Sequence, residues 1–165
     1  LISLPFTDLY LMGRGDERKV RRGLAPIRRL LEASVPVALA SNNIRNPFTP
    51  SGTADPAHLT FVGAVAAHMG TPELMRELVA AVTTYAARIL NLRDYGCAAG
   101  CRADLVMWDC RRPEEIVTSL PARRLVLKAG RVSVEHERRV VERWRSGNAH
   151  KDHTRIDTAG GRHVE

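Results

Sequence analysis

The feature that most constrains this chain is a short apolar run that stops abruptly at polar residues. Residues 37–40 read VALA and are followed at once by Ser41, Asn42 and Asn43. An apolar run of this length, closed by turn-prone residues, is typical of a buried parallel strand. The carboxyl ends of parallel strands are where α/β proteins place their ligands. The sequence therefore predicts a buried strand that ends at a working surface.

The loop after this strand has a shape that two prolines restrict. Pro47 and Pro50 each fix φ and remove an N–H donor, so the segment does not continue directly as a helix. Two interpretations stay open from the residues alone: a loop that lines a ligand site, or an ordinary connection whose asparagines hydrogen-bond their own backbone. The side chains available to line the loop are Asn42, Asn43, Arg45, Asn46 and Phe48.

Composition limits the class of protein. Of the 165 residues, 44% are hydrophobic and 26% are charged, which is typical of a globular domain or of a piece of a larger one. The net charge of +7 is compatible with an anionic partner but does not specify one. We find no apolar run of membrane-spanning length and no signal segment, so we expect a cytoplasmic protein without a membrane partner.

The three cysteines are Cys97, Cys101 and Cys110. Structural zinc sites use two pairs of closely spaced ligands, and these spacings do not match that pattern. We therefore expect reduced, structural thiols.

The first part of the chain alternates between strand and helix patterns. Residues 1–4 have the pattern of a strand although the chain starts with Leu1 rather than Met, as expected for a piece of a longer protein. Residues 5–16 mix apolar residues with two glycines and are predicted to form a loop over a site. Apolar positions at helical spacing predict a helix over residues 24–33, with Pro26 in its first turn.

Three helices are predicted in succession after the proline-containing loop: residues 57–68, 71–82 and 83–90. The first follows Asp55 and Pro56, an N-cap and a first-turn proline, and its apolar residues on several sides predict that it is largely buried. A short helix is predicted over 113–117. The pattern elsewhere changes to strands, the last two joined by a hairpin turn, at residues 103–109, 124–128 and 131–134.

Residues 136–165 form a polar tail rich in arginine and histidine. Its low apolar content predicts disorder or a loose helix. An alternative is metal binding by His150 and His153, but no further ligand stands at a suitable spacing.

Three segments carry a resemblance to a known family. They are LYLMGRGDERKVRRGLAPIRRLLEA, VALASNNIRNPFTPSGTAD and, most specifically, LRDYGCAAGCRADLVMWD. In residues and in order they resemble the C-terminal part of the metal-dependent amidohydrolase superfamily, and within it the cytosine deaminase branch. The resemblance covers about residues 1–134.

The resemblance implies an α/β fold, in which a (β/α)8 TIM-type barrel carries its site at the carboxyl ends of the strands. Residues 1–4 resemble the seventh barrel strand and residues 37–40 the eighth. We predict three regions on this basis, which are a C-terminal barrel segment with extra helices at 1–92, returning strands of a small β-sandwich at 93–135, and the tail at 136–165.

The resemblance also implies a chemistry. A divalent metal, zinc or iron, lowers the pKa of a bound water, and a carboxylate at the end of the eighth strand moves its proton. Two consecutive aspartates of the cytosine deaminase branch match Asn42 and Asn43 here. An amide does not accept that proton and brings no negative charge. We therefore expect Asn42 to be a weak metal ligand through its carbonyl oxygen, or to orient water.

Four residues are predicted as the site. Asn42 and Asn43 stand at the catalytic positions, while Phe48 and Asn46 are predicted to bind the substrate. Phe48 matches an aromatic residue that packs against the flat heterocycle in the deaminase branch, and plain packing is its alternative role. The histidine ligands of the family would lie upstream of Leu1, so we expect this chain alone to retain no metal and to be inactive.

The function implied for the complete protein is hydrolysis of a C–N bond in a cyclic amide or a cytosine-like heterocycle. The alternative is a catalytically inactive remnant or a small-molecule binding module on the same scaffold. A small molecule is the expected partner, together with association into a homo-oligomer. Nucleic acid is not expected, because the basic stretches lack a recognised motif and interleaved aromatic residues.

Overall fold

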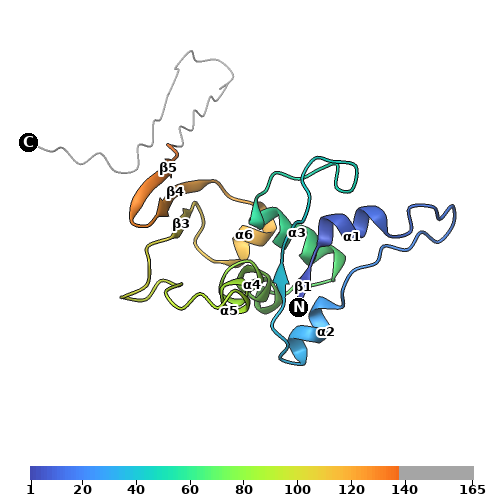
Figure 1. Ribbon diagram of the computed structural model, residues 1–165, viewed down its shortest axis with the longest axis horizontal. Helices are drawn as coiled ribbons and strands as arrows, with labels where there is room; N and C mark the ends of the chain where they lie inside the picture. The colour runs from blue at the N-terminus through green and yellow to red at the C-terminus, as the bar shows by residue number, and fades with distance from the viewer. Residues whose placement is uncertain (138–165) are drawn as a thin grey trace, which may run out of the picture.

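The computed structural model describes residues 1–137, so the predictions for the tail beyond them, including His150 and His153, lie outside the described residues. The order of elements is mixed α/β: a parallel strand pair lies among the helices, and an antiparallel sheet lies at one end (Figure 1). Among the described residues, no helix is long and apolar enough to cross a membrane. The predicted division at residues 92 and 135 stays a prediction.

The two strands expected at residues 1–4 and 37–40 are confirmed, and each is shorter than predicted. β1 (Ile2–Ser3) pairs in parallel with β2 (Ala38–Leu39), with Ser3 opposite Leu39. The pair is extended by backbone hydrogen bonds from Ala38 N to Leu1 O and from Ala40 N to Ser3 O, of 2.9 and 3.0 Å. Both strands therefore end on the same side of the sheet, where the polar loop begins.

The helices begin where the sequence provides caps. α3 (Pro56–Ala66) starts after Asp55, whose Oδ1 accepts a hydrogen bond from Ala57 N at 3.0 Å. α4 (Pro72–Ala81) starts after Thr71, whose hydroxyl accepts from Leu74 N at 3.4 Å. In both helices proline occupies the first position, where its missing N–H costs no hydrogen bond. α5 (Thr84–Ile89) follows directly, so the predicted succession of three helices is confirmed.

The prediction of a loop over residues 5–16 is wrong for the first half of this segment. It forms α1 (Pro5–Leu11), because Pro5 takes the first helical position and Asp8 N bonds Leu4 O at 3.0 Å. The predicted loop character holds only after α1. α2 (Ile27–Glu32) is shorter than expected, and Pro26 precedes it as the cap residue instead of lying inside the first turn.

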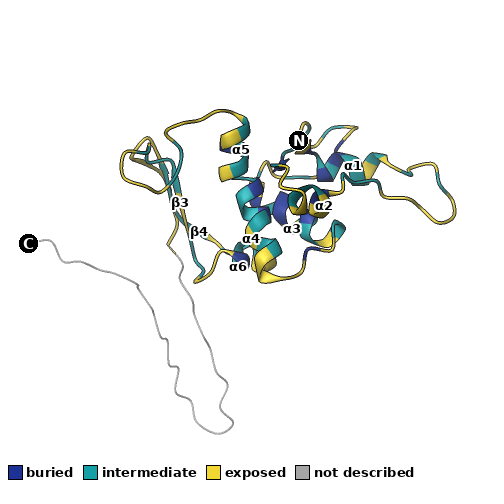
Figure 2. Ribbon diagram, turned by 90° about the horizontal axis from the view of Figure 1, so that it is seen from below, coloured by how far each residue is buried: buried dark blue, intermediate teal, exposed yellow. Residues whose placement is uncertain are grey.

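The core is formed where β2 packs against α3 and α4. Gly63 on α3 faces leucines of both other elements, since a Cβ added there would stand 3.2 Å from Leu39 Cδ1 and 3.4 Å from Leu78 Cδ2. A side chain at this glycine would therefore make a tight contact with both leucines. Figure 2 shows buried residues gathered around α3 and α4. The buried cluster consists of Ile27, Val37, Leu39, Leu59, Met69, Leu78, Ala81 and Val117.

The expectation that α3 is largely buried is wrong for its outer face. Phe61 is 42% exposed and Val65 is 64% exposed, although both are large and apolar. They lie four residues apart and therefore on one side of the helix. The buried residues Leu59, Thr60 and Gly63 are on the side that faces the core. Apolar composition predicted burial all round, whereas only one face of α3 has described neighbours that bury it.

The second sheet is antiparallel, with the order β3-β4-β5, and it lies at one end of the molecule (Figure 1). Its strands are β3 (Leu105–Trp108), β4 (Arg123–Lys128) and β5 (Arg131–Glu135), which confirms the three predicted strands. α6 (Glu114–Ser119) lies between β3 and β4 and buries Val117 in the core cluster. This short helix therefore connects the sheet to the helices.

Asp104 fastens the β4–β5 turn to the start of β3. Its Oδ2 accepts a hydrogen bond from Lys128 Nζ at 2.6 Å, and its Oδ1 accepts one from Ala129 N at 2.7 Å. Arg102 forms a further ion pair with the same carboxylate at 2.8 Å. The Lys128 hydrogen bond, followed by that of the Ala129 N–H, lowers the pKa of Asp104 from 3.8 to about 2. The folded chain therefore favours the ionised form.

We predict that Asp104 makes the stability of the chain acid-dependent. Because its pKa is lowered on folding, its contribution is complete above the unfolded value of 3.8 and is lost as the pH falls toward about 2. Asp104→Asn should lower the free energy of unfolding at neutral pH, and the difference from the wild type should shrink across this window. Urea unfolding of both proteins as a function of pH measures it. A difference that stays constant with pH would contradict the assignment.

Candidate functional site

The candidate site is the loop that follows β2, at the carboxyl ends of the parallel strands. Ser41 starts it, and its Oγ donates a hydrogen bond to the backbone oxygen of Asn43 at 2.6 Å. Arg45 adopts a positive φ of 54° and donates from Nε to Gly52 O at 3.3 Å. The loop is therefore closed at its base and turned by its own polar groups, which gives the following side chains defined positions.

Asn42 is held by the buried hydroxyl of Thr7, which is in turn hydrogen-bonded to the hydroxyl of Thr49. Thr7 Oγ1, on α1, donates to Asn42 Oδ1 at 2.7 Å, and it also lies 2.7 Å from Thr49 Oγ1. A hydroxyl has one proton, so Thr7 gives its proton to Asn42 and accepts one from Thr49. Thr7 is 8% exposed and Thr49 1% exposed. This chain of hydrogen bonds positions the amide of Asn42 with its oxygen toward Thr7 and leaves its N–H groups as the donors that remain.

Asn43 and Asn46 form the second half of the loop. Asn46 Nδ2 donates to Asn43 Oδ1 at 2.6 Å. Asn46 Oδ1 accepts from the backbone N–H groups of Phe48 and Thr49, each at 3.0 Å. The alternative interpretation, in which asparagine side chains bond their own backbone, is therefore confirmed for Asn46. Its role in binding a substrate stays a prediction, and both ends of its amide already have partners within the loop.

Phe48 presents its ring at the surface of the loop. The residue is 59% exposed, although it follows Pro47 in a segment whose backbone is held by Asn46. An aromatic ring on a restrained backbone can stack on a flat ligand at a small cost in conformational entropy. Within the described residues the ring is more than half exposed, and both roles, stacking on a substrate and plain packing, stay predictions.

The described residues do not form a metal site of the kind that the resemblance implies. Within residues 1–137 no group of three or more histidine, cysteine, aspartate or glutamate side chains is arranged to hold a metal ion. The predicted weak ligand, Asn42 Oδ1, is neutral and already accepts the proton of Thr7. Zinc and iron sites are built from imidazole, thiolate and carboxylate groups, which this loop lacks.

A cavity of about 350 Å³ lies beside the base of the loop. Ala40, Ser41 and Ile44 contribute to its wall from the strand end, and Phe6 contributes from α1. Most of the lining is apolar, with Leu59 and Val82 from the helical side. Asn42, Asn43, Asn46 and Phe48 are not among its lining residues. The structure thus brings the four predicted residues together in one loop but does not place them in this cavity.

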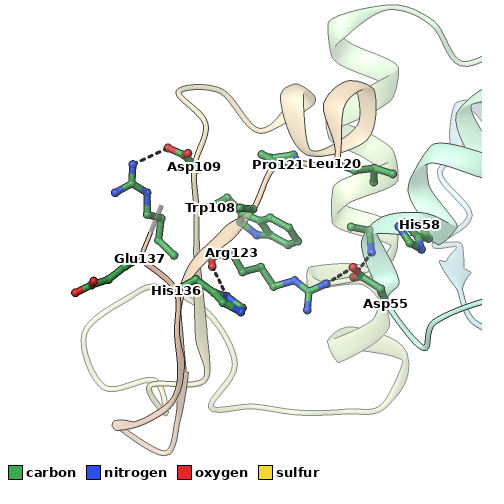
Figure 3. A pocket seen from close by; sticks show the side chains of 12 residues that line it. Asp55, His58, Trp108, Asp109, Leu120, Pro121, Arg123, His136 and Glu137 are labelled. Atoms are coloured by element: carbon green, nitrogen blue, oxygen red, sulfur yellow. Dashed lines mark hydrogen bonds and ion pairs between the residues drawn. The ribbon is translucent and has the colours of Figure 1, made fainter. Parts of the chain in front are cut away.

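A second hollow, of about 450 Å³, lies between α3 and the antiparallel sheet (Figure 3). Arg123 crosses it to pair with Asp55, and its guanidinium lies 5.2 Å from the centre of the Trp108 ring. His136 Nδ1 donates to the backbone oxygen of Arg123 at 2.9 Å. Sequence reasoning did not find this hollow, because its walls come from segments that are far apart in the chain. Its ionic groups join the sheet to α3.

Thr7 and Thr49 are the residues of the candidate site that sequence reasoning missed. They lie 42 positions apart and bond each other only because the tertiary structure places α1 against the loop that follows β2. No spacing rule connects two threonines at such a separation. The one signal available was indirect: a threonine with its hydroxyl in a predicted apolar environment needs a partner.

Comparison with known proteins identifies the class. The model of the amidohydrolase family matches residues 2–134, which is most of the chain. The chain therefore belongs to the amidohydrolase family. The predicted resemblance is confirmed at this level, and the mixed α/β arrangement agrees with it.

Two kinds of curated relatives show the range of this similarity. The chain is 35% identical over 134 residues to a pterin deaminase of Rhizobium rhizogenes, covering 80% of this chain and 30% of the relative. It is 39% identical over 132 residues to an imidazolonepropionase of Anaeromyxobacter dehalogenans, covering 78% of this chain and 28% of the relative. The chain thus spans about three tenths of the length of the curated relatives that it matches.

Solved structures give the same result. The chain superimposes with a TM-score of 0.78 on 5-methylcytosine deaminase from Klebsiella pneumoniae liganded with phosphonocytosine, at 28% identity. This match covers 84% of the chain and 34% of the deaminase. N-isopropylammelide isopropylaminohydrolase from Burkholderia multivorans matches with a TM-score of 0.64 at 27% identity, over 67% of this chain and 28% of that one.

We predict that Thr7→Val destabilises the chain through the loop. Valine has a similar shape but leaves the buried Thr49 hydroxyl without its acceptor and Asn42 without its donor. The expected loss in free energy of unfolding is about 1–3 kcal/mol. Thr7→Ser keeps the hydroxyl and is the matched control, with a smaller loss. Urea unfolding of the two variants compares them, and equal losses would exclude the hydroxyl as the cause.

Proposed function

We propose that this chain is part of an amidohydrolase that, in the complete protein, hydrolyses a C–N bond of a cyclic amide or a cytosine-like heterocycle. The main support for this proposal is the ordered loop at the carboxyl ends of β1 and β2, in which Asn42 is held by a hydrogen bond and Phe48 is exposed. The names of the relatives support the substrate class, since pterin deaminase and 5-methylcytosine deaminase act on small nitrogen heterocycles.

The loop residues have separable roles in this proposal. Thr7 fixes the amide of Asn42, so that its remaining N–H groups donate to an oxygen or ring nitrogen of the substrate. Phe48 stacks on the flat ring. Asn46 keeps the backbone of Phe48 in place through the 3.0 Å hydrogen bond to its N–H. These groups bind and orient, and none of them accepts a proton at neutral pH.

In the complete protein, a divalent metal, zinc or iron, would be held by residues other than the described ones. The neutral Asn42 amide, which already accepts a hydrogen bond from Thr7, does not fit such a metal as a ligand. A soluble cytoplasmic enzyme that associates with copies of itself is the setting that we propose for this chemistry.

A second function is favoured by the same residues. Amides stand at both positions where the cytosine deaminase branch was expected to have aspartates, and each amide oxygen already accepts a hydrogen bond, from Thr7 and from Asn46. A loop of this kind recognises hydrogen-bond acceptors without providing a base. The alternative is therefore a small-molecule binding module, or an inactive remnant, on the amidohydrolase scaffold.

Replacing the amide with a carboxylate separates the two functions. If the missing carboxylate limits deamination, Asn42→Asp in the complete protein should raise ammonia release from cytosine by about tenfold or more, since a positioned base contributes at least that much. Asn91→Asp makes the same chemical change on an exposed residue after α5 and is the matched control. No gain with Asn42→Asp, while the protein stays folded and metal-loaded, would favour the binding module.

The isolated chain should retain no metal through Asn42. We predict that the 165-residue chain, purified in the presence of zinc and iron and then dialysed, contains far less than one ion per chain by elemental analysis. The physical reason is the neutral amide oxygen, which is already a hydrogen-bond acceptor for Thr7. Stoichiometric metal that is lost in Asn42→Ala, but not in Asn91→Ala, would contradict this prediction.

A further inference from the structure

The segment between α5 and β3 is a closed loop that contains two of the three cysteines. Arg102 N donates to Asp94 O at 2.8 Å, which brings the two ends of residues 94–102 together. Cys97 and Cys101 lie inside this ring and are both free thiols. Loop closure has already restricted the distance between them, so joining the two sulfurs requires little further loss of chain entropy.

The backbone within the loop turns back between the two cysteines and brings the Cys101 sulfur close to Gly96. Cys101 N donates to Ala98 O at 3.1 Å, which makes a tight turn immediately after Cys97. A Cβ added at Gly96 would stand 3.6 Å from Cys101 Sγ, so this sulfur lies back over the residue that precedes Cys97. Disulfides join residues whose Cα atoms are about 4.4–6.8 Å apart, a range that residues on either side of such a turn can reach.

The backbone between the two cysteines is also flexible enough for a disulfide to form. Gly96 and Gly100 have φ values of +143° and +90°, and the residues between the two cysteines are otherwise alanines. No bulky side chain therefore stands between the thiols along the chain. Cys97 is exposed and Cys101 is partly exposed, so an oxidant dissolved in water reaches the first, and the second thiol follows four residues later in the same closed loop.

Cys110 differs from the pair in position and environment. It lies after β3, outside the closed loop. Burial, and then the nearby Glu115 and Asp109 carboxylates, raise the pKa of its thiol. Because the thiolate is the reactive form, Cys110 is the internal control that the chain itself provides.

We propose that Cys97 and Cys101 form a reversible disulfide when the chain meets a peroxide. The Cys97 thiolate attacks one oxygen of hydrogen peroxide, the O–O bond breaks, and a sulfenic acid and water form after protonation. The Cys101 sulfur then attacks the Cys97 sulfur, the S–O bond breaks, and a second water leaves. Two thiols lose two hydrogens in total, and one peroxide is reduced to two waters. The disulfide would cross-link residues 97 and 101, in the segment that leads into Asp104 and β3.

The tryptic map of this chain isolates the proposed site. Trypsin cleaves after Arg93, Arg102 and Arg111, so the peptide of residues 94–102 contains Cys97 and Cys101 and no other cysteine. Cys110 falls in the next peptide, residues 103–111. The full chain is treated with hydrogen peroxide, alkylated with iodoacetamide, digested and analysed by mass spectrometry. We expect peptide 94–102 without alkylation and two hydrogens lighter, and peptide 103–111 alkylated. Dithiothreitol before alkylation should restore two alkylated thiols.

Variants make the assignment specific. Cys110→Ser should leave the oxidised 94–102 peptide unchanged, whereas Cys97→Ser and Cys101→Ser should each abolish it, with circular dichroism showing that both remain folded. Three results would overturn the proposal: a disulfide between two chains through Cys97, a disulfide that includes Cys110, or oxygen added to Cys97 while Cys101 stays free. None of these outcomes depends on the proposed hydrolase activity, since mass alone is measured.

Discussion

The contact between β2 and the helices α3 and α4 is the constraint on which the rest of the structure depends. Leu39 and Leu78 are buried in the same cluster, and both lie next to Gly63 on α3, which has no side chain to separate them from the helix. Burial of a leucine side chain contributes roughly 1.5–3 kcal/mol, so a few such contacts outweigh the small number of hydrogen bonds in a two-residue strand. Because this contact fixes where β2 ends, it also fixes where the polar loop begins.

The loop takes its shape from neutral hydrogen bonds. Thr49, Thr7 and Asn42 form one chain of donors and acceptors, and Asn43 and Asn46 form another. Neutral hydrogen bonds are insensitive to pH in the physiological range, and buried hydroxyls are costly to leave without partners. The result is a rigid surface of amides and one exposed aromatic ring. This character supports recognition of a small heterocycle more directly than it supports proton transfer.

The ion pairs hold the antiparallel sheet together and join it to α3. The ion pairs of Asp104 hold the hairpin turn to β3, and the pair of Asp55 with Arg123 joins α3 to β4 across the hollow of Figure 3. Asp55 also caps α3, so one carboxylate serves both the helix and its contact with the sheet. Acid therefore acts on the hairpin turn held by Asp104 before it acts on the neutral hydrogen bonds of the loop. Cys97 and Cys101 lie in the segment just before Asp104, which leads into β3.

The sequence by itself determined the elements whose signals are local. A cap and a proline predicted the start of α3, a short hairpin turn predicted β4 and β5, and the quoted segments predicted the family. Only the tertiary structure decided that residues 5–11 form a helix, that Phe61 and Val65 stay exposed, and that Thr7 and Thr49 meet at Asn42. The physical reason is range: propensity and capping act within a few residues, whereas burial and hydroxyl partners depend on segments that only packing brings together.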